Sequence, residues 1–335
     1  MTDPGPRDAD LVLEGGGVKA PALAGAVAAL QQAGYRFHRI AGTSSGSLVG
    51  ALVAAGLPAA ELHQRLLDTD YRALLDPTFW KHLPIPVVSD ALAELADQAL
   101  YRGDALHELV AAELAAAGVR TFADLRVDDP GMDPSVPAER RYKLAVVVSD
   151  LTRRRMVRIP WYMRRDYGID PDTIAVADAV RMSTAIPFFY KPFRLRSQLT
   201  GEDSFMVDGG VTDTFPVHIF DRTDGLPPRW PTIHIGLSAA LPPEQRVPEP
   251  SGIVDFLGAL VVTAMDGRDS FDLDVPETAR RSVRIDTSYV DPMDFGIDRA
   301  TRERLYADGY AAVQRFLQTF SFPAYQAAWT RPAAS

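Results

Sequence analysis

The amino-acid sequence predicts an α/β fold with a mostly parallel central sheet. Its 335 residues are 47% hydrophobic, which is enough to bury the core of one large domain. Short apolar runs alternate with helical runs of small residues in the first part of the chain. This alternation is typical of parallel strands that are joined by helices. We therefore expect one α/β domain over residues 8–322.

The first elements follow one another as strand, helix, strand and helix. Leu11–Leu13 predicts a buried strand, and Ala20–Gln32 predicts an alanine-rich helix with Pro21 in its first turn. Tyr35–Ala41 predicts the second strand and Ser45–Ala55 the second helix. Because crossover connections are right-handed, both helices should begin at the same edge of the sheet, where ligands bind in open α/β folds.

Residues 58–140 are expected to form a mainly helical insertion. Within it, Leu74–Val88 combines aromatic residues with three prolines, which favours either a lid over an apolar cleft or a loop whose aromatic side chains fill the core. The remaining chain predicts strands at Tyr142–Val148, Arg155–Ile159, Phe205–Val207 and Thr232–Leu237, a helix at Ile174–Ser183 and a C-terminal amphipathic helix over residues 301–320.

Composition excludes several classes of function. Lys and Arg total 35 against 44 Asp and Glu, a formal net charge of −9, so we expect no nucleic-acid partner and only local, largely apolar membrane contact. The chain has no cysteine, which rules out disulfides and thiolate chemistry. The six histidines lack metal-ligand spacing, so neither a metal nor a cofactor is expected.

The localisation expected from sequence is cytoplasmic. The first residues lack the apolar core of a Sec-type signal peptide, and no stretch approaches the roughly 18 apolar residues of a membrane span. Signal-independent secretion stays open.

A serine-containing turn lies between the second strand and the second helix. Gly42 and Gly46 flank Ser44 in the pattern G-x-S-x-G, which predicts a nucleophile elbow that exposes the serine hydroxyl on a sharp turn. The neighbouring Ser45 is expected to cap the helix. A Gly/Ser linker is the alternative interpretation, because both residue types are common in turns.

A run of three glycines precedes the first helix. Gly15–Gly17 can direct successive backbone amides at one anion, such as the oxyanion of acyl transfer, and Lys19 adds positive charge nearby. The same segment, with Ala20, also satisfies the dinucleotide fingerprint G-x-G-x-x-G/A. The second strand offers Arg36 and Arg39 rather than the acidic residue that binds a ribose, so only an NADP-type site would fit.

An aspartate follows the predicted strand Phe205–Val207. Asp208 can turn its carboxylate toward a site at the sheet edge, while Gly209 and Gly210 leave space beside it. The alternative is an ordinary Asp-Gly turn.

Four segments together resemble the patatin-like phospholipase family. They are Gly15–Lys19, Gly42–Gly46, Ser183–Pro187 and Asp208–Gly210, and they occur in the order typical of that family. The resemblance covers about residues 10–217. Two positions depart from the family pattern: Ala20 replaces a usual glycine, and Thr214 replaces a frequent asparagine. Neither change affects the expected nucleophile or base.

The resemblance implies a three-layer α/β/α fold and a serine hydrolase that uses a Ser–Asp dyad. It assigns Ser44 as nucleophile, Asp208 as base and the amides of Gly15, Gly16 and Gly17 as oxyanion hole. Supporting roles fall to Lys19, Gly42, Gly46, Gly209 and Gly210. The implied substrates are phospholipids, lysophospholipids or simpler acyl esters, reached with or without peripheral membrane contact.

Three alternatives remain at this point. A triad with His218 or His234 would place a histidine between serine and aspartate. An NADP-type binding domain would use the glycine run for a pyrophosphate. A catalytically silent lipid-binding module would keep the fold without the reaction.

Overall fold

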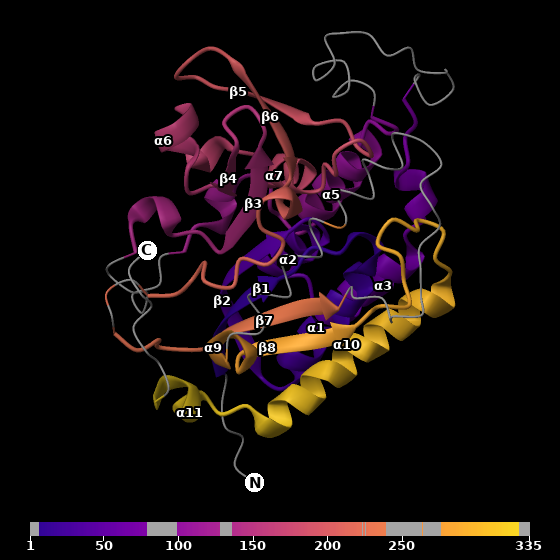
Figure 1. Ribbon diagram of the computed structural model, residues 1–335, viewed down its shortest axis with the longest axis vertical. Helices are drawn as coiled ribbons and strands as arrows, with labels where there is room; N and C mark the ends of the chain where they lie inside the picture. Colours follow the sequence, from indigo (N-terminus) through magenta and orange to yellow (C-terminus); the bar gives the residue numbers. More distant parts are fainter. Residues whose placement is uncertain are drawn as a thin grey trace.

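The computed structural model describes residues 7–78, 99–127, 136–222, 224, 226–238, 263 and 276–327. In this part of the chain an eight-stranded sheet forms the centre, with strand order β5-β6-β3-β2-β1-β7-β8 and β4 paired to β3 (Figure 1). The strands are β1 (Arg7–Leu13), β2 (Tyr35–Thr43), β3 (Leu144–Asp150), β4 (Arg155–Ile159), β5 (Phe193–Arg196), β6 (Asp203–Asp208), β7 (Thr232–Ser238) and β8 (Ser282–Asp286).

Helices surround this sheet. The α-helices are α1 (Ala20–Gln32), α2 (Ser45–Ala54), α3 (Ala59–Asp68), α5 (Asp104–Ala116), α6 (Met163–Tyr167), α7 (Val176–Ser183), α9 (Pro276–Ala279), α10 (Arg299–Thr319) and α11 (Phe322–Ala327). Single 3-10 turns include η1 (Gly17–Lys19), η2 (Tyr71–Leu74) and η7 (Gly209–Val211). Among the described residues, no helix is both long and apolar enough to cross a membrane.

The middle of the sheet is parallel. β1 pairs in parallel with β2 and β7, β2 with β3, and β7 with β8. The pairs formed by β4, β5 and β6 are antiparallel. Every residue of β3 is buried, as expected for a strand with both faces covered. The predicted α/β/α arrangement with a mostly parallel sheet is confirmed.

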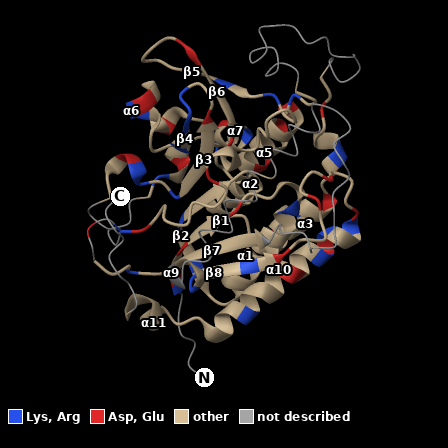
Figure 2. Ribbon diagram, in the orientation of Figure 1, with Lys and Arg blue, Asp and Glu red and all other residues tan. Residues whose placement is uncertain are grey.

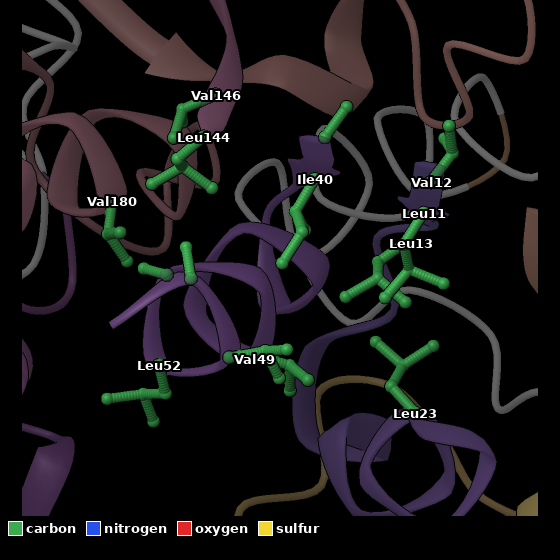
Figure 3. Close-up of a cluster of buried hydrophobic side chains, with 14 of the residues drawn as sticks. Leu11, Val12, Leu13, Leu23, Ile40, Val49, Leu52, Leu144, Val146 and Val180 are labelled. Atoms are coloured by element: carbon green, nitrogen blue, oxygen red, sulfur yellow. The ribbon is translucent and has the colours of Figure 1, made fainter. Parts of the chain in front are cut away.

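The core lies between the central strands and the first two helices. In Figure 3, Ile40 of β2 points toward α2 and its Val49, and Leu13 of β1 lies beside Leu23 of α1. These side chains have no exposure to solvent. Charged residues lie mainly on outer helices and loops, as along α10 in Figure 2. The sheet edge that carries the serine turn therefore rests on a packed apolar base.

Most predicted elements are found at or near their expected positions. Ala20–Gln32 and Arg155–Ile159 match α1 and β4 residue for residue, and the helix expected over 301–320 is α10. The described part of the 58–140 insertion contains α3, η2 and α5. Of the proposed lid, residues 79–88 lie outside the described residues. The sequence did not predict β5 or β8.

Candidate active site

Ser44 lies on a strained turn between β2 and α2. Its φ is 50° and its ψ is −125°, a conformation rare for a residue with a side chain. Two glycines permit the tight turn: a Cβ on Gly42 would lie 2.3 Å from the Gly46 carbonyl oxygen, and a Cβ on Gly46 would lie 2.3 Å from that of Leu13. This strand–turn–helix is the context that a nucleophile elbow requires.

Asp208 lies at the end of β6 and is fully buried. Its Oδ1 accepts a 2.8 Å hydrogen bond from the Gly210 amide. Burial raises the pKa of Asp208 to about 7, although the Ser44 hydroxyl and the Gly210 amide act in the opposite direction. Oδ2 accepts no well-aligned hydrogen bond among the described residues. One carboxylate oxygen beside the serine hydroxyl is thus available for a proton.

The two glycines after Asp208 bring its strand end against the elbow. A Cβ on Gly209 would lie 2.3 Å from the Val147 carbonyl oxygen and 2.9 Å from Cγ2 of Thr43. Thr43 Oγ1 also donates to the Asp213 carbonyl at 3.1 Å. The segment after β6 therefore packs directly on the residue that precedes Ser44.

The three glycines of the first loop differ in the hydrogen bonds of their amides. The Gly15 amide donates to the Thr214 carbonyl at 3.3 Å, and the Gly16 amide donates to Ser45 Oγ at 2.9 Å. The Gly17 amide donates to no atom of the described residues. Gly17 has a φ of 55°, and a Cβ there would lie 2.0 Å from the Pro292 carbonyl oxygen. A Cβ on Gly15 would lie 3.1 Å from Ser44 Cβ, so the loop lies against the elbow.

Two serines hold the elbow in ways that the sequence did not predict. Ser183 Oγ accepts the Ser44 amide at 2.8 Å and donates to the Val147 carbonyl at 2.6 Å. Ser45 was expected to cap α2, but no side chain caps that helix, and its hydroxyl accepts the Gly16 amide instead. The only signal for Ser183 was its place in the small-residue block, because a bond across 139 positions depends on the tertiary fold.

An apolar pocket opens beside Ser44. It encloses about 880 Å³, including the part open to solvent, and its polar surface is small. The wall near the serine includes Gly17, Val18 and Ala20. The rest of the wall is formed by side chains of α2, α3, η2 and α5, with Ile186, Tyr190 and Phe295. An apolar pocket with few polar groups suits an acyl chain.

The histidines of the alternative triad have other partners. His218 lies 2.7 Å from Asp221, and the buried His234 lies 3.2 Å from the Ser282 hydroxyl. Burial lowers the pKa of His234 well below its ordinary value. The described hydrogen bonds of the Asp208 carboxyl group are with Ser44 and Gly210, without a histidine. Within the described ranges, no cluster of three or more His, Asp or Glu residues could hold a metal ion.

The basic residues of the dinucleotide alternative are also occupied. Arg36 forms an ion pair with Asp8, and Arg39 donates to Asp10. Both guanidinium groups are thus paired with carboxylates of β1. Lys19, which was expected to support the site, is buried at the end of η1. Its charge acts on Asp286: the pKa of that carboxyl group is lowered mainly by hydrogen bonds from Ser288 and, more weakly, by the charges of Arg304 and Lys19.

Comparison with known proteins agrees with this architecture. The family model of patatin-like phospholipase matches residues 11–221, a range that contains all four motif segments. Uncharacterized protein YqhO of Bacillus subtilis (strain 168) is 35% identical over 263 residues, which cover 78% of this chain and 81% of that protein.

Two solved structures align with this chain at low sequence identity. VipD from Legionella pneumophila aligns with a TM-score of 0.51 and 16% identity over 94% of this chain and 67% of its own. ExoU of Pseudomonas aeruginosa, in its complex with SpcU, aligns with a TM-score of 0.46 and 19% identity. That alignment covers 94% of this chain and 53% of the matched chain. This chain therefore spans about half the length of that protein. On the family match over residues 11–221, this chain belongs to the patatin-like phospholipase family of lipid acyl hydrolases.

Proposed function

We propose that this protein hydrolyses acyl esters through a Ser44–Asp208 dyad. The observation that supports it best is the position of Ser44: its strained turn opens into an apolar pocket, and its hydroxyl interacts with a fully buried carboxyl group. A buried carboxylate with a pKa near 7 is a suitable general base at neutral pH, because it can accept a proton and release it again.

The proposed reaction has two displacements. Ser44 Oγ attacks the ester carbonyl carbon, and its proton moves to Asp208. The tetrahedral intermediate then collapses, and the leaving alcohol takes the proton from Asp208. A water molecule attacks the acyl-enzyme, gives its proton to Asp208 and forms the carboxylic acid product. Asp208 returns the proton to Ser44 as the acyl group leaves.

We assign the oxyanion to the loop before α1. Of its three glycine amides, that of Gly17 has no hydrogen-bond partner among the described residues, and Gly17 lines the pocket beside Ser44. Gly15 and Gly16 would shape the loop through their bonds to Thr214 and Ser45 rather than contact the oxyanion. Losing one such donor typically reduces kcat by about 10²–10³.

A panel of lipids tests the proposal. Wild type is expected to release fatty acid from at least one phospholipid, lysophospholipid or simple ester, and Ser44→Ala and Asp208→Asn are each expected to lose about 10³-fold or more in rate. Comparison of vesicles with dissolved esters shows whether membrane contact contributes. Ser47→Ala is the matched control, since Ser47 donates to the Ser44 carbonyl but does not line the pocket.

The outcomes separate the alternatives. Full activity in Ser44→Ala or Asp208→Asn would remove the dyad. Activity lost in His218→Ala, with the fold intact, would favour a triad. A folded wild type that hydrolyses none of the lipids and does not react with a fluorophosphonate would favour a silent lipid-binding module.

A further inference from the structure

The acyl pocket is apolar along its walls but has one ion pair among its lining residues. Its walls near α2 are formed by Leu48 and Leu52, which lie one and two turns beyond Ser44 on the same helical face. The charged residues among the described lining are Arg65 of α3 and Glu113 of α5. They form an ion pair with each other. The pair thus joins two helices that bound the pocket.

The ion pair lies at the end of the pocket away from Ser44. On α5, Glu113 follows Leu106 by about two turns, or roughly 10 Å. The start of α5 is the end near the catalytic side, because Gly103 lies against Arg181 of α7, two residues before the Ser183 that accepts the Ser44 amide. On α3, Arg65 lies about one turn beyond Leu62, and α3 begins shortly after the end of α2 that is away from Ser44.

The pair also separates the apolar interior from solvent. The Arg65 side chain is 33% exposed and the Glu113 side chain 22%. Leu52, Leu62 and Val110, which line the same region, are buried. A chain terminus that reached past the leucines would meet two charged groups, and displacing them would break their ion pair.

We propose that the Arg65–Glu113 ion pair closes the far end of the acyl pocket and limits the acyl chain to medium length. The distance along α2 from Ser44 to Leu52 is about 12 Å at 1.5 Å per residue. An extended chain advances about 1.2 Å per bond, so this distance accommodates roughly ten carbon atoms. The inference rests on the proposed function, since it assumes that the acyl carbonyl lies at Ser44.

The first test measures kcat/KM for p-nitrophenyl esters from butyryl to palmitoyl. For wild type, we expect an optimum at octanoyl or decanoyl and at least about a tenfold lower value for palmitoyl. Glu113→Ala breaks the ion pair and frees Arg65 to turn toward the exposed Glu61, so its palmitoyl to octanoyl ratio should rise at least about fivefold. Glu61→Ala is the matched control, because Glu61 is the other carboxylate partner of Arg65 but is exposed and does not line the pocket. The chain-length profile of Glu61→Ala should match that of wild type.

The second test does not depend on catalysis. Binding of free fatty acids to Ser44→Ala is measured by titration calorimetry below their micelle concentrations. Affinity should rise by up to about fourfold per methylene as far as decanoic acid and then level off. In Ser44→Ala/Glu113→Ala it should continue to rise toward palmitic acid.

Two results would overturn the inference. The first is that wild type hydrolyses palmitoyl and octanoyl esters equally well and Ser44→Ala binds the two fatty acids equally well. The second is that Glu113→Ala and Glu61→Ala show the same dependence on chain length. A wild type without any hydrolysis would count against the proposed function alone, because the binding titration still measures the length of the pocket.

Discussion

At the scale of single residues, the site combines a strained backbone with a buried charge. Ser44 holds a φ of 50°, which only a well-packed surrounding structure can maintain. The carboxyl group beside it has no exposure to solvent, and burial raises its pKa. Both features lower stability, and both favour reaction: the turn exposes the hydroxyl to the pocket, and the raised pKa makes the carboxylate a stronger base.

The pKa of Asp208 predicts how activity depends on pH. The base must be ionised to accept the serine proton, so kcat/KM should rise with pH and reach half its plateau near pH 7, the value to which burial raises the pKa. A pH profile with a soluble ester measures it. A profile that is flat between about pH 5 and about pH 8, or that falls across this range, would contradict the assignment of Asp208 as base.

The same shift predicts a pH-dependent stability. Below the ordinary pKa of 3.8 the carboxyl is protonated in both folded and unfolded chains. As pH rises toward about 7, the unfolded chain ionises first, so the folded state loses stability until its own carboxyl ionises. Asp208→Asn cannot ionise and avoids this loss. Its Tm should exceed that of wild type by more at about pH 8 than at about pH 5. An equal difference at both pH values would be contrary evidence.

At the scale of elements, the site depends on three segments that meet at the start of α2. Ser183, at the end of α7, binds the Ser44 amide, and Ser45 binds the loop before α1 through Gly16. The segment after β6 packs on Thr43. These contacts connect the elbow with the glycine loop before α1, the end of α7 and the end of β6.

Removing one of these contacts should impair catalysis more than folding. We expect Ser45→Ala to lower kcat by about 10- to 100-fold with KM little changed, because the Gly16 amide loses its acceptor and the loop is no longer held near the oxyanion. Steady-state kinetics and a thermal melt measure both effects. Ser47→Ala, in the same helix, should keep kcat within about threefold. Equal kcat values in the two variants would show that the Ser45 contact has no positioning role.

The sequence predicted the elements that have strong internal signals. The alanine-rich helix α1 carries a clear pattern over its whole length, and β4 follows the strongly apolar strand β3 as its partner; the bounds of both were correct. The strands β5 and β8 were missed because they are only four and five residues long, alternate with exposed charged residues and do not follow a strongly apolar strand in the sequence as β4 does. A pattern of period two over so few residues does not distinguish a strand from a loop.

The site was predictable only in part for a different reason. Gly42, Gly46 and Asp208 are local signals, since a tight turn and a strand end are visible in the sequence itself. The bonds of Ser45 to Gly16 and of Ser183 to Ser44 join residues 29 and 139 positions apart, so they depend on how the elements pack. For the same reason, the sequence could not distinguish the Gly17 amide from the amides of Gly15 and Gly16.

At the scale of the whole molecule, the C-terminal helix belongs to the core. α10 crosses α1 at close range: a Cβ on Gly309 would lie 1.9 Å from the Ala22 carbonyl oxygen, and one on Gly25 would lie 2.0 Å from that of Tyr306. This packing supports our proposal that residues 8–322 form one domain, with residues 58–140 as an insertion that contributes pocket walls.

The glycine contact predicts a large effect from one methyl group. Gly309→Ala should lower the free energy of unfolding by about 1–3 kcal/mol, although alanine favours a helix, because the added carbon collides with backbone. Gln314→Ala on the exposed face of α10 should stay within about 0.5 kcal/mol. Urea unfolding measures both. A Gly309→Ala protein as stable as wild type would refute the close crossing.

The most direct test of the dyad is to locate the residue that a fluorophosphonate modifies. We expect mass spectrometry of the labelled wild type to find the phosphonate on Ser44, with labelling absent in Ser44→Ala and slowed at least about 10²-fold in Asp208→Asn. Modification of another serine, or unchanged labelling of the Asp208→Asn protein, would contradict the proposal that Ser44 is activated by Asp208.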